Sequence, residues 1–160
     1  MTELTILGLD PGTNAMGWGI VSLVQRQERL VNSGVLHPKG KNISQRLGSL
    51  YHDLSALFQS HPCHVVAMES VFVHRNVQST VTLGYARGLA LAIAAHHHVD
   101  VIDYSPSSIK KGLTGSGRAT KEQMQHMIWR LYGHTVPADA ADALAVALYH
   151  ARQVPFALPS

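Results

Sequence analysis

Two short apolar runs of this chain each end in an acidic residue, and this pattern constrains the fold more than any other feature of the sequence. Asp10 closes the run Thr5–Leu9, and Glu69 closes the run His64–Met68. Both runs have the length and composition of buried strands. A carboxylate beside a buried strand is costly to desolvate unless a partner neutralises it. The pattern therefore predicts two interior strands that each present an acid to a shared partner.

A second pair of acids lies near the start of an alanine-rich helical pattern. Asp139 and Asp142 stand three residues apart, so they project from neighbouring positions on one face of a helix. If they meet Asp10 and Glu69, four negative charges repel one another, and divalent cations are the usual remedy. Oxygen-only ligands favour Mg²⁺ or Mn²⁺ over zinc. The four acids together indicate two-metal phosphodiester chemistry.

Each of these acids also has a simpler interpretation. Asp10 precedes a Pro-Gly turn and could be an ordinary turn aspartate, and Glu69 could be a strand-exit residue. Asp139 could merely complement the helix dipole, an effect worth about 0.3–1 kcal/mol. The dipole explains Asp142 less well, because this residue lies deeper among alanines. The joint occurrence of all four favours a site over coincidence.

Length and composition are typical of one globular domain spanning residues 1–160. The chain is 46% hydrophobic, which supports a core, and its formal charge of +3 permits a polyanionic partner without demanding one. The single cysteine, Cys63, cannot form an internal disulfide and favours a reducing compartment. No secretory leader or apolar stretch of about 20 residues is evident, so we expect a cytoplasmic protein without membrane association.

Hydrophobic periodicity and turn residues predict an α/β fold, with a mixed five-stranded sheet and helices on both faces. Short turns separate the first three strands, which should form an antiparallel meander. The remaining strands alternate with helices. The predicted strands cover residues 4–9, 17–24, 30–36, 64–71 and 99–104, and the predicted helices cover 44–58, 79–97, 120–132 and 137–149.

Several segments resemble the bacterial RuvC-type Holliday junction resolvases, in order and over nearly the whole chain. The resemblance implies a ribonuclease-H-like fold and a homodimer that nicks four-way junction DNA symmetrically, in homologous recombination and DNA repair. It also implies Mg²⁺ as cofactor, with two ions per active site and Mn²⁺ as a substitute, and branch-migration proteins of the RuvA and RuvB type as partners. The matching segments are Leu7-Gly-Leu-Asp-Pro-Gly-Thr13, Met68-Glu-Ser-Val-Phe72, Leu83-Gly-Tyr-Ala-Arg-Gly88, Gly115-x-Gly-x-x-x-Lys121 and Ala138-Asp-Ala-Ala-Asp-Ala-Leu-Ala145.

The resemblance implies roles for individual residues. The four acids fall on the family's catalytic, metal-binding tetrad, and Lys121 falls on a further catalytic position. Phe72 falls on an aromatic residue that contacts the junction, where stacking on a base is worth about 1–3 kcal/mol. A core aromatic and solvated lysines are the simpler alternatives. The expected DNA-binding residues are Phe72, Arg75, Asn76, Lys110, Lys111 and Arg118.

Small residues recur along the predicted helix 79–97. Gly84, Gly88, Ala92 and Ala95 follow helical spacing, and glycine inside a helix costs about 0.5–1 kcal/mol relative to alanine. This stripe could pack on the chain's own sheet or against a second copy. The resemblance favours the second copy.

Two positions depart from the family pattern, and other functions stay open. Ser70 stands where a longer amide side chain is expected, and the sequence ends at Ser160 without a basic tail. A related nuclease that acts on RNA or single strands, or a junction-binding module without catalysis, is the alternative. The first turn also resembles the phosphate loop of actin-like ATPases, which need a second subdomain. Asp103 is expected to be a turn or network residue.

Overall fold

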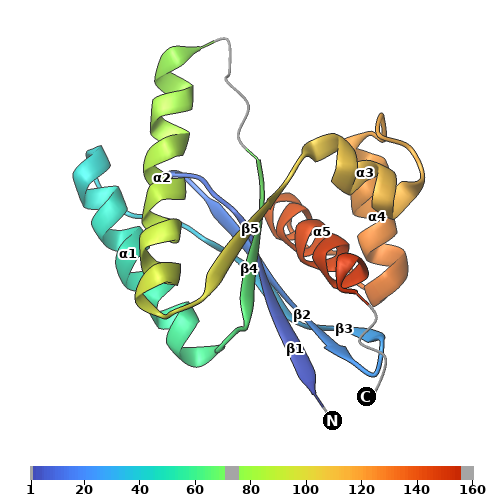
Figure 1. Ribbon diagram of the computed structural model, residues 1–160. Helices are drawn as coiled ribbons and strands as arrows, with labels where there is room; N and C mark the ends of the chain where they lie inside the picture. Colours follow the sequence, from blue (N-terminus) through green and yellow to red (C-terminus); the bar gives the residue numbers. More distant parts are fainter. Residues whose placement is uncertain (1, 71–75, 156–160) are drawn as a thin grey trace.

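The structure, a computed structural model, describes residues 2–70 and 76–155 and contains one five-stranded sheet with helices on both faces (Figure 1). The predicted α/β arrangement is therefore confirmed. The strands are β1 (Glu3–Asp10), β2 (Met16–Val24), β3 (Gln27–Leu36), β4 (Val65–Glu69) and β5 (Asp100–Tyr104). The helices are α1 (Ile43–Ser60), α2 (Val77–His96), α3 (Pro106–Thr114), α4 (Lys121–Tyr132) and α5 (Ala138–Gln153).

The strand order is β3-β2-β1-β4-β5, and the first three strands form the predicted antiparallel meander. By contrast, β4 runs parallel to both β1 and β5. The parallel register pairs Leu9 with Met68. Because parallel strands end at the same edge of a sheet, Asp10 and Glu69, the next residue in each strand, leave the sheet side by side.

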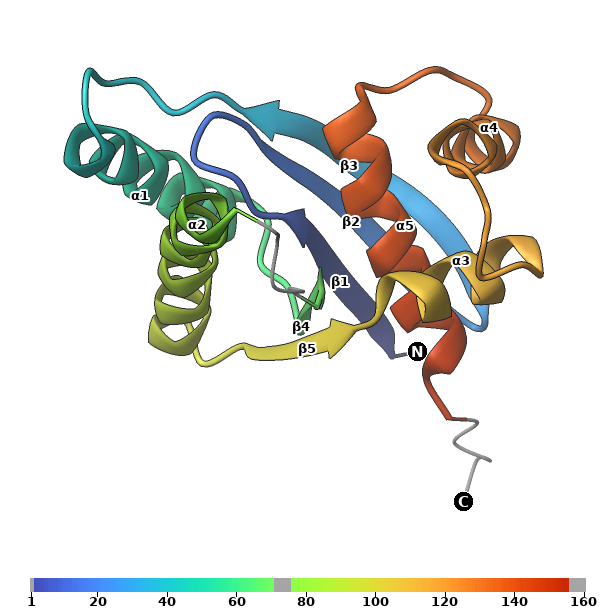
Figure 2. The ribbon, with the colours of Figure 1, turned by 90° about the horizontal axis from the view of Figure 1, so that it is seen from above.

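Alternate residues of the central strands face opposite layers, as strand geometry requires. Ile6, Val65 and Ala67 belong to a buried cluster shared with α3, α4 and α5. Leu7 and Val66 belong to a second cluster shared with α1 and α2. Figure 2 shows the two helical layers on either side of the sheet. Among the described residues, no helix is both long enough and apolar enough to cross a bilayer.

The first turns of α5 lie directly on β1 and β2. A Cβ atom on Gly8 would overlap the main-chain oxygen of Ala143, and one on Gly17 would overlap that of Asp139. Only glycine permits such close backbone approach. Gly17 is also the register partner of Asp10. The glycines therefore place the start of α5 beside the end of β1.

The main difference from the predicted elements is α3, which the sequence pattern left without a helix. Ser105 caps it by accepting a hydrogen bond from the Ser108 amide at 3.1 Å, and Pro106 occupies the first turn. Pro106 suits that position because its missing N–H has no helical partner there. The predicted cap at Thr120 is confirmed and forms a complete capping box. Helix α1 begins after Asn42, which replaces the predicted cap at Ser44.

Candidate active site

Three carboxylates meet where β1 ends and α5 begins. Asp10, Asp139 and Asp142 each place one carboxylate oxygen within 4.8 Å of the other two. All three side chains are partly buried. The i, i+3 spacing on α5 aims Asp139 and Asp142 in one direction, and the close packing of α5 on the glycines of the sheet brings them to Asp10. The predicted convergence is therefore present for these three acids.

The fourth acid, Glu69, lies close to this group but outside it. It lines a cavity of about 180 Å³ together with Lys110, Lys121 and Asp142. Burial raises the pKa values of both Asp10 and Glu69, and the charge of Glu69 adds to the rise at Asp10, as the charge of Asp142 does at Glu69. Glu69 therefore shares the electrostatic field of the cluster and lines the same cavity as Asp142.

Burial and mutual repulsion oppose ionisation of the acids. Burial, followed by the charges of Asp142, Asp139 and Glu69, raises the pKa of Asp10 to about 7. Desolvation likewise raises the pKa values of Glu69 and Asp142. A bound cation would relieve the repulsion among these carboxylates in place of protons. The donors are all carboxylate oxygens, which fit a hard divalent cation such as Mg²⁺ or Mn²⁺.

Two lysines approach the acids from the helices that follow β5. Lys121, the first residue of α4, places its Nζ atom 3.5 Å from a carboxylate oxygen of Asp142, and this contact raises the pKa of Lys121. The lysine side chain is 57% exposed, so it can also reach a bound anion. Lys110 lies on α3, and its charge partly offsets the rise that burial causes in the pKa values of Glu69 and Asp142. The missed helix α3 is thus what carries Lys110 to the site.

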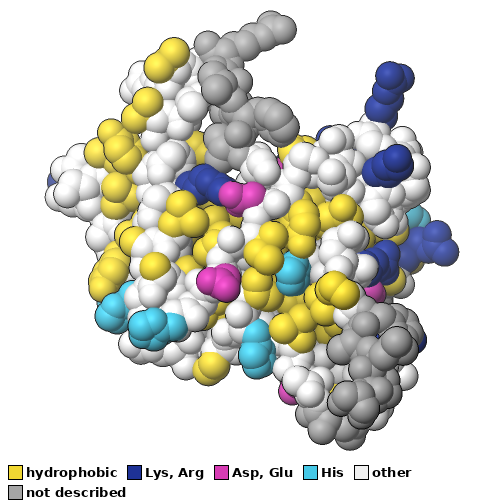
Figure 3. Space-filling view, in the orientation of Figure 1, with side chains coloured by type: hydrophobic (Ala, Val, Ile, Leu, Met, Phe, Trp, Pro, Cys, Tyr) yellow, Lys and Arg dark blue, Asp and Glu magenta, His cyan; other side chains and the backbone are white. Residues whose placement is uncertain are grey.

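Of the expected DNA-binding residues, the structure describes Asn76, Lys110, Lys111 and Arg118. Lys111 and Arg118 are exposed, and Figure 3 shows lysine and arginine side chains gathered over α3 and α4. Asn76 caps α2, and its Oδ1 atom accepts a hydrogen bond from the Gln78 amide at 2.9 Å. Phe72 and Arg75 lie outside the described residues.

Sequence reasoning missed one residue at this edge, Arg87 of α2. It donates a hydrogen bond from Nη1 to the main-chain oxygen of Glu69 at 3.2 Å. It also forms an ion pair with Asp103 of β5, which is consistent with the expected network role of that aspartate. The contact to Glu69 joins residues eighteen apart and involves a main-chain atom. A pattern of side-chain types in the sequence therefore could not predict it.

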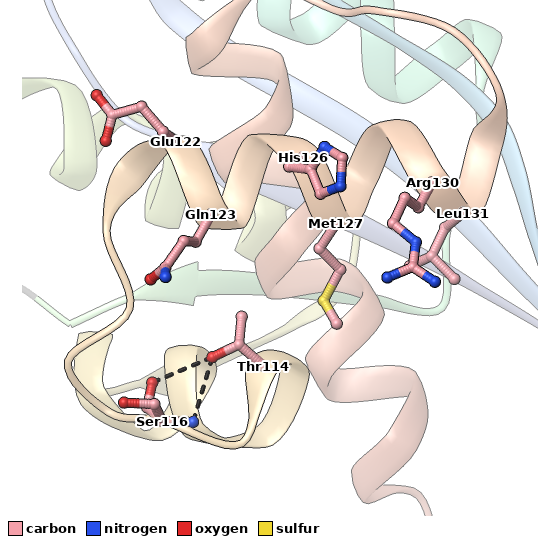
Figure 4. A pocket seen from close by; sticks show the side chains of 8 residues that line it. All are labelled: Thr114, Ser116, Glu122, Gln123, His126, Met127, Arg130 and Leu131. Carbon is pink, nitrogen blue, oxygen red and sulfur yellow. Dashed lines mark hydrogen bonds between the residues drawn. The ribbon is translucent and has the colours of Figure 1, made fainter.

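A larger cavity of about 730 Å³ lies away from the acids, between α4 and the end of α3 (Figure 4). Inside it, the Thr114 hydroxyl donates to the Ser116 carbonyl oxygen at 3.1 Å. None of the four acids lines this cavity. Its lining consists of Thr114, Ser116, Glu122, Gln123, His126, Met127, Arg130 and Leu131.

The small-residue stripe of α2 faces solvent. A Cβ atom on Gly84 or Gly88 would meet no atom within 4 Å, and Ala92 and Ala95 are exposed. The buried residues of α2, such as Ala86 and Ala90, lie on the opposite face. Packing on the chain's own sheet therefore does not explain the stripe. Its apolar neighbours on the exposed side are Val77, Val81, Tyr85 and Leu91.

Residues 6–150 match the family described as crossover junction endodeoxyribonuclease RuvC. The protein of that name from Chromohalobacter salexigens is 44% identical over 148 residues, which cover 91% of this chain and 80% of the relative. The one from Halorhodospira halophila is 45% identical over 149 residues, covering 91% and 89%. Among solved structures, Thermus thermophilus RuvC in complex with a Holliday junction substrate superposes with a TM-score of 0.84 at 29% identity, covering 92% of this chain and 93% of the other.

Proposed function

The chain belongs to the family of crossover junction endodeoxyribonucleases RuvC, and on this premise we propose that it is a Holliday junction resolvase that cuts four-way DNA junctions with symmetric paired nicks. Its ribonuclease-H-like fold is the one that the sequence resemblance implied. The observation that carries the proposal is the meeting of Asp10, Asp139 and Asp142, with Glu69 lining the same small cavity as Asp142. This arrangement supplies an all-oxygen donor set to a metal-dependent nuclease.

The four acids are the proposed metal ligands. Asp10, Asp142 and Glu69 would hold the metal ions, and Asp139 would serve as a further ligand or orient water. Two such ions, when bound, polarise the phosphoryl group and lower the pKa of the attacking water. Mg²⁺ is the proposed ion, and Mn²⁺ should substitute because it accepts the same oxygen ligands.

The neighbouring cations bind and orient the DNA strand. Lys121, already beside Asp142, offsets negative charge on the phosphoryl oxygens as the reaction proceeds. Lys110, Lys111 and Arg118 contact backbone phosphates, and such contacts fix the register of a strand without reading its sequence. Phe72 would stack on an unpaired base at the crossover, and Arg75 and Asn76 would contact the DNA.

A homodimer is part of the proposal. A four-way junction offers two equivalent strands, so two active sites related by a two-fold axis match the substrate. The exposed stripe Gly84, Gly88, Ala92 and Ala95 supports this, since it leaves room for a second helix to approach closely. The proposed partners are branch-migration proteins of the RuvA and RuvB type, and the proposed setting is a single domain acting in the cytoplasm.

The deciding experiment compares a synthetic four-way junction, a linear duplex and a single strand, each incubated with the protein and Mg²⁺ and resolved strand by strand. The proposal expects paired nicks in the junction alone, with Mn²⁺ substituting, Ca²⁺ supporting binding without cutting, and EDTA abolishing cutting. An Asp142→Asn variant controls for contaminating nucleases. Equal cutting of the single strand, or of RNA, would instead favour the related-nuclease alternative.

A further inference from the structure

The peptide group that joins Glu69 to Ser70 is held at both ends. Its N–H, on Ser70, donates to the main-chain oxygen of Tyr104 at 2.7 Å. Its carbonyl oxygen, on Glu69, accepts the hydrogen bond from Arg87 at 3.2 Å. A peptide group is planar, so fixing both sides of it fixes the backbone orientation from which the Glu69 side chain leaves β4.

Arg87 supplies a side-chain hydrogen bond to the carbonyl side. The register between β1 and β4 ends at the pair Leu9 and Met68, whereas β4 and β5 stay paired through Glu69 and Tyr104. If the Glu69 carbonyl at the end of β4 loses this hydrogen bond, the loss costs free energy or the carbonyl turns toward water. Loss of the guanidinium would therefore let the end of β4 rotate.

Asp103 in turn orients Arg87. The two side chains form an ion pair, with Arg87 15% exposed and Asp103 43% exposed. A planar guanidinium can donate to the Asp103 carboxylate from one nitrogen and to the Glu69 carbonyl from another. The single ammonium nitrogen of lysine cannot reproduce this two-pronged geometry. The ion pair alone could serve stability only, but the second contact ends on the backbone of a proposed metal ligand.

We propose that Arg87 is a positioning residue for the metal site, and that it acts by locking the Glu69–Ser70 peptide group so that the Glu69 carboxylate faces Asp10 and Asp142. The inference rests on the proposed function insofar as Glu69 is taken as a metal ligand. Arg87 touches neither metal nor substrate in this role. Asp103 is the residue that keeps its guanidinium in place.

The sign of the effect on metal binding separates this role from simple electrostatics. Arg87 carries a positive charge near the acids, and removal of a positive charge by itself strengthens the attraction of the site for a cation. Loss of positioning has the opposite effect, since a metal ligand that is no longer oriented binds more weakly. Changes to residues that orient metal ligands typically cost about 10–100-fold in affinity or activity.

The test measures Mn²⁺ binding by the protein without DNA, from the electron paramagnetic resonance signal of free Mn²⁺. Arg87→Gln should weaken Mn²⁺ binding about tenfold or more, and Arg87→Lys should recover only part of the loss, because an ammonium can donate to the Glu69 carbonyl oxygen but cannot also hold Asp103 in the same geometry. Arg29→Gln is the matched control, since Arg29 is an exposed arginine on β3 at the far edge of the sheet. Cleavage rates across a Mg²⁺ titration should show a raised Mg²⁺ requirement in Arg87→Gln, with junction binding in Ca²⁺ unchanged.

Folded Arg87→Gln protein that binds Mn²⁺ as tightly as wild type, or more tightly, overturns the inference. If that variant does not fold, Arg87→Lys decides in the same way, and unfolding of both variants would show a purely structural role. The Mn²⁺ measurement needs no substrate. A wild-type protein that binds Mn²⁺ but leaves junctions uncut would therefore refute the proposed function while the role of Arg87 was still being measured.

Discussion

Gly17 lies so close to Asp139 that a Cβ atom on the glycine would overlap the main-chain oxygen of the aspartate. Gly17 also stands opposite Asp10 in the ladder between β1 and β2. A single backbone contact therefore sets how far the start of α5 lies from the end of β1. The spacing of the acids depends on a residue that has no side chain.

Gly17→Ala should accordingly destabilise the protein and disturb the acidic cluster. Overpacking of this kind typically costs about 1–3 kcal/mol, which thermal unfolding will detect. Gly48→Ala is the control, because a Cβ atom there meets nothing within 4 Å. Alanine inside α1 should raise stability by about 0.5–1 kcal/mol. A Gly17→Ala protein with wild-type melting temperature and Mg²⁺ dependence would show that the close approach is not required.

Removal of any one of the four acids should abolish most cleavage. Asp10→Asn, Glu69→Gln, Asp139→Asn and Asp142→Asn should each lower the single-turnover rate about 100-fold or more, a loss in the range seen when one transition-state-stabilising group is removed. Junction binding should persist, because removing a carboxylate also removes repulsion toward DNA. Glu122→Gln, a neutralised exposed acid on α4, is the control. A near-normal rate in one of the four variants would exclude that residue as a ligand.

The acids at the strand ends could be predicted from sequence, because an apolar run that forms a buried strand is recognised from neighbouring residues alone. Apolar runs predicted β1 and β4 with an acid at the end of each, and the parallel pairing of the two strands in the structure brings Asp10 and Glu69 to one edge. The course of α3 could not be predicted, since Ser105-Pro106 signals the end of a strand as readily as the cap of a helix.

The contact of Arg87 with Glu69 was beyond prediction for a different reason. It depends on how α2 lies across the ends of β4 and β5. In addition, its acceptor is a main-chain oxygen, which every residue has, so the sequence pattern does not distinguish it. The exposure of the α2 stripe was equally undetermined, because small residues suit close packing on a sheet as well as close packing on another helix. In both cases tertiary placement decides the outcome.

The free energy of unfolding should depend on pH in a way that the ionisation of Asp10 determines. In the metal-free protein, burial and the neighbouring acids raise its pKa from the ordinary value of 3.8 to about 7. The folded state therefore binds more protons than the unfolded state between these values, so the contribution of Asp10 is full below about pH 4 and is lost as pH rises through about 7. Its size is a few kcal/mol at most.

The measurement is the melting temperature without metal at pH 5 and pH 8, for wild type and for Asp10→Asn. The difference between the two pH values should shrink in the variant, which cannot ionise at this position. Mg²⁺ should stabilise wild type more at pH 8 than at pH 5, because the cation then replaces the missing protons. An identical pH profile for the two proteins would contradict the raised pKa.

Phe72→Ala should impair cutting of junctions more than it impairs folding, while Phe72→Tyr and Phe72→Trp should be largely tolerated. A stacking residue loses about 1–3 kcal/mol of binding per base when truncated. A core phenylalanine would behave otherwise, since truncation costs about 3–5 kcal/mol of stability and tryptophan overpacks the site. Melting temperature and cutting rate, measured on the same three variants, separate the two roles.

Substitutions in the exposed stripe of α2 should separate two copies of the chain without unfolding either. Gly88→Leu and Ala92→Arg place a bulky or charged side chain where the structure leaves open space, so the monomer has no internal clash to relieve. In a dimer the same side chains hold two helices apart. Sedimentation should therefore show a folded monomer, and gels should show single, uncoordinated nicks in place of paired ones.

Ala56→Arg is the matched control for this pair, because Ala56 is an exposed alanine on α1, away from the stripe. It should leave both the sedimentation profile and paired nicking unchanged. Circular dichroism distinguishes dissociation from unfolding, and an unfolded Gly88→Leu chain would mean that the open space beside α2 is needed by the monomer itself. If both stripe variants remain folded dimers that make paired nicks, the two-fold contact must lie on another surface. An interface built on Gly84, Gly88 and Ala92 could not accommodate an arginine at its centre.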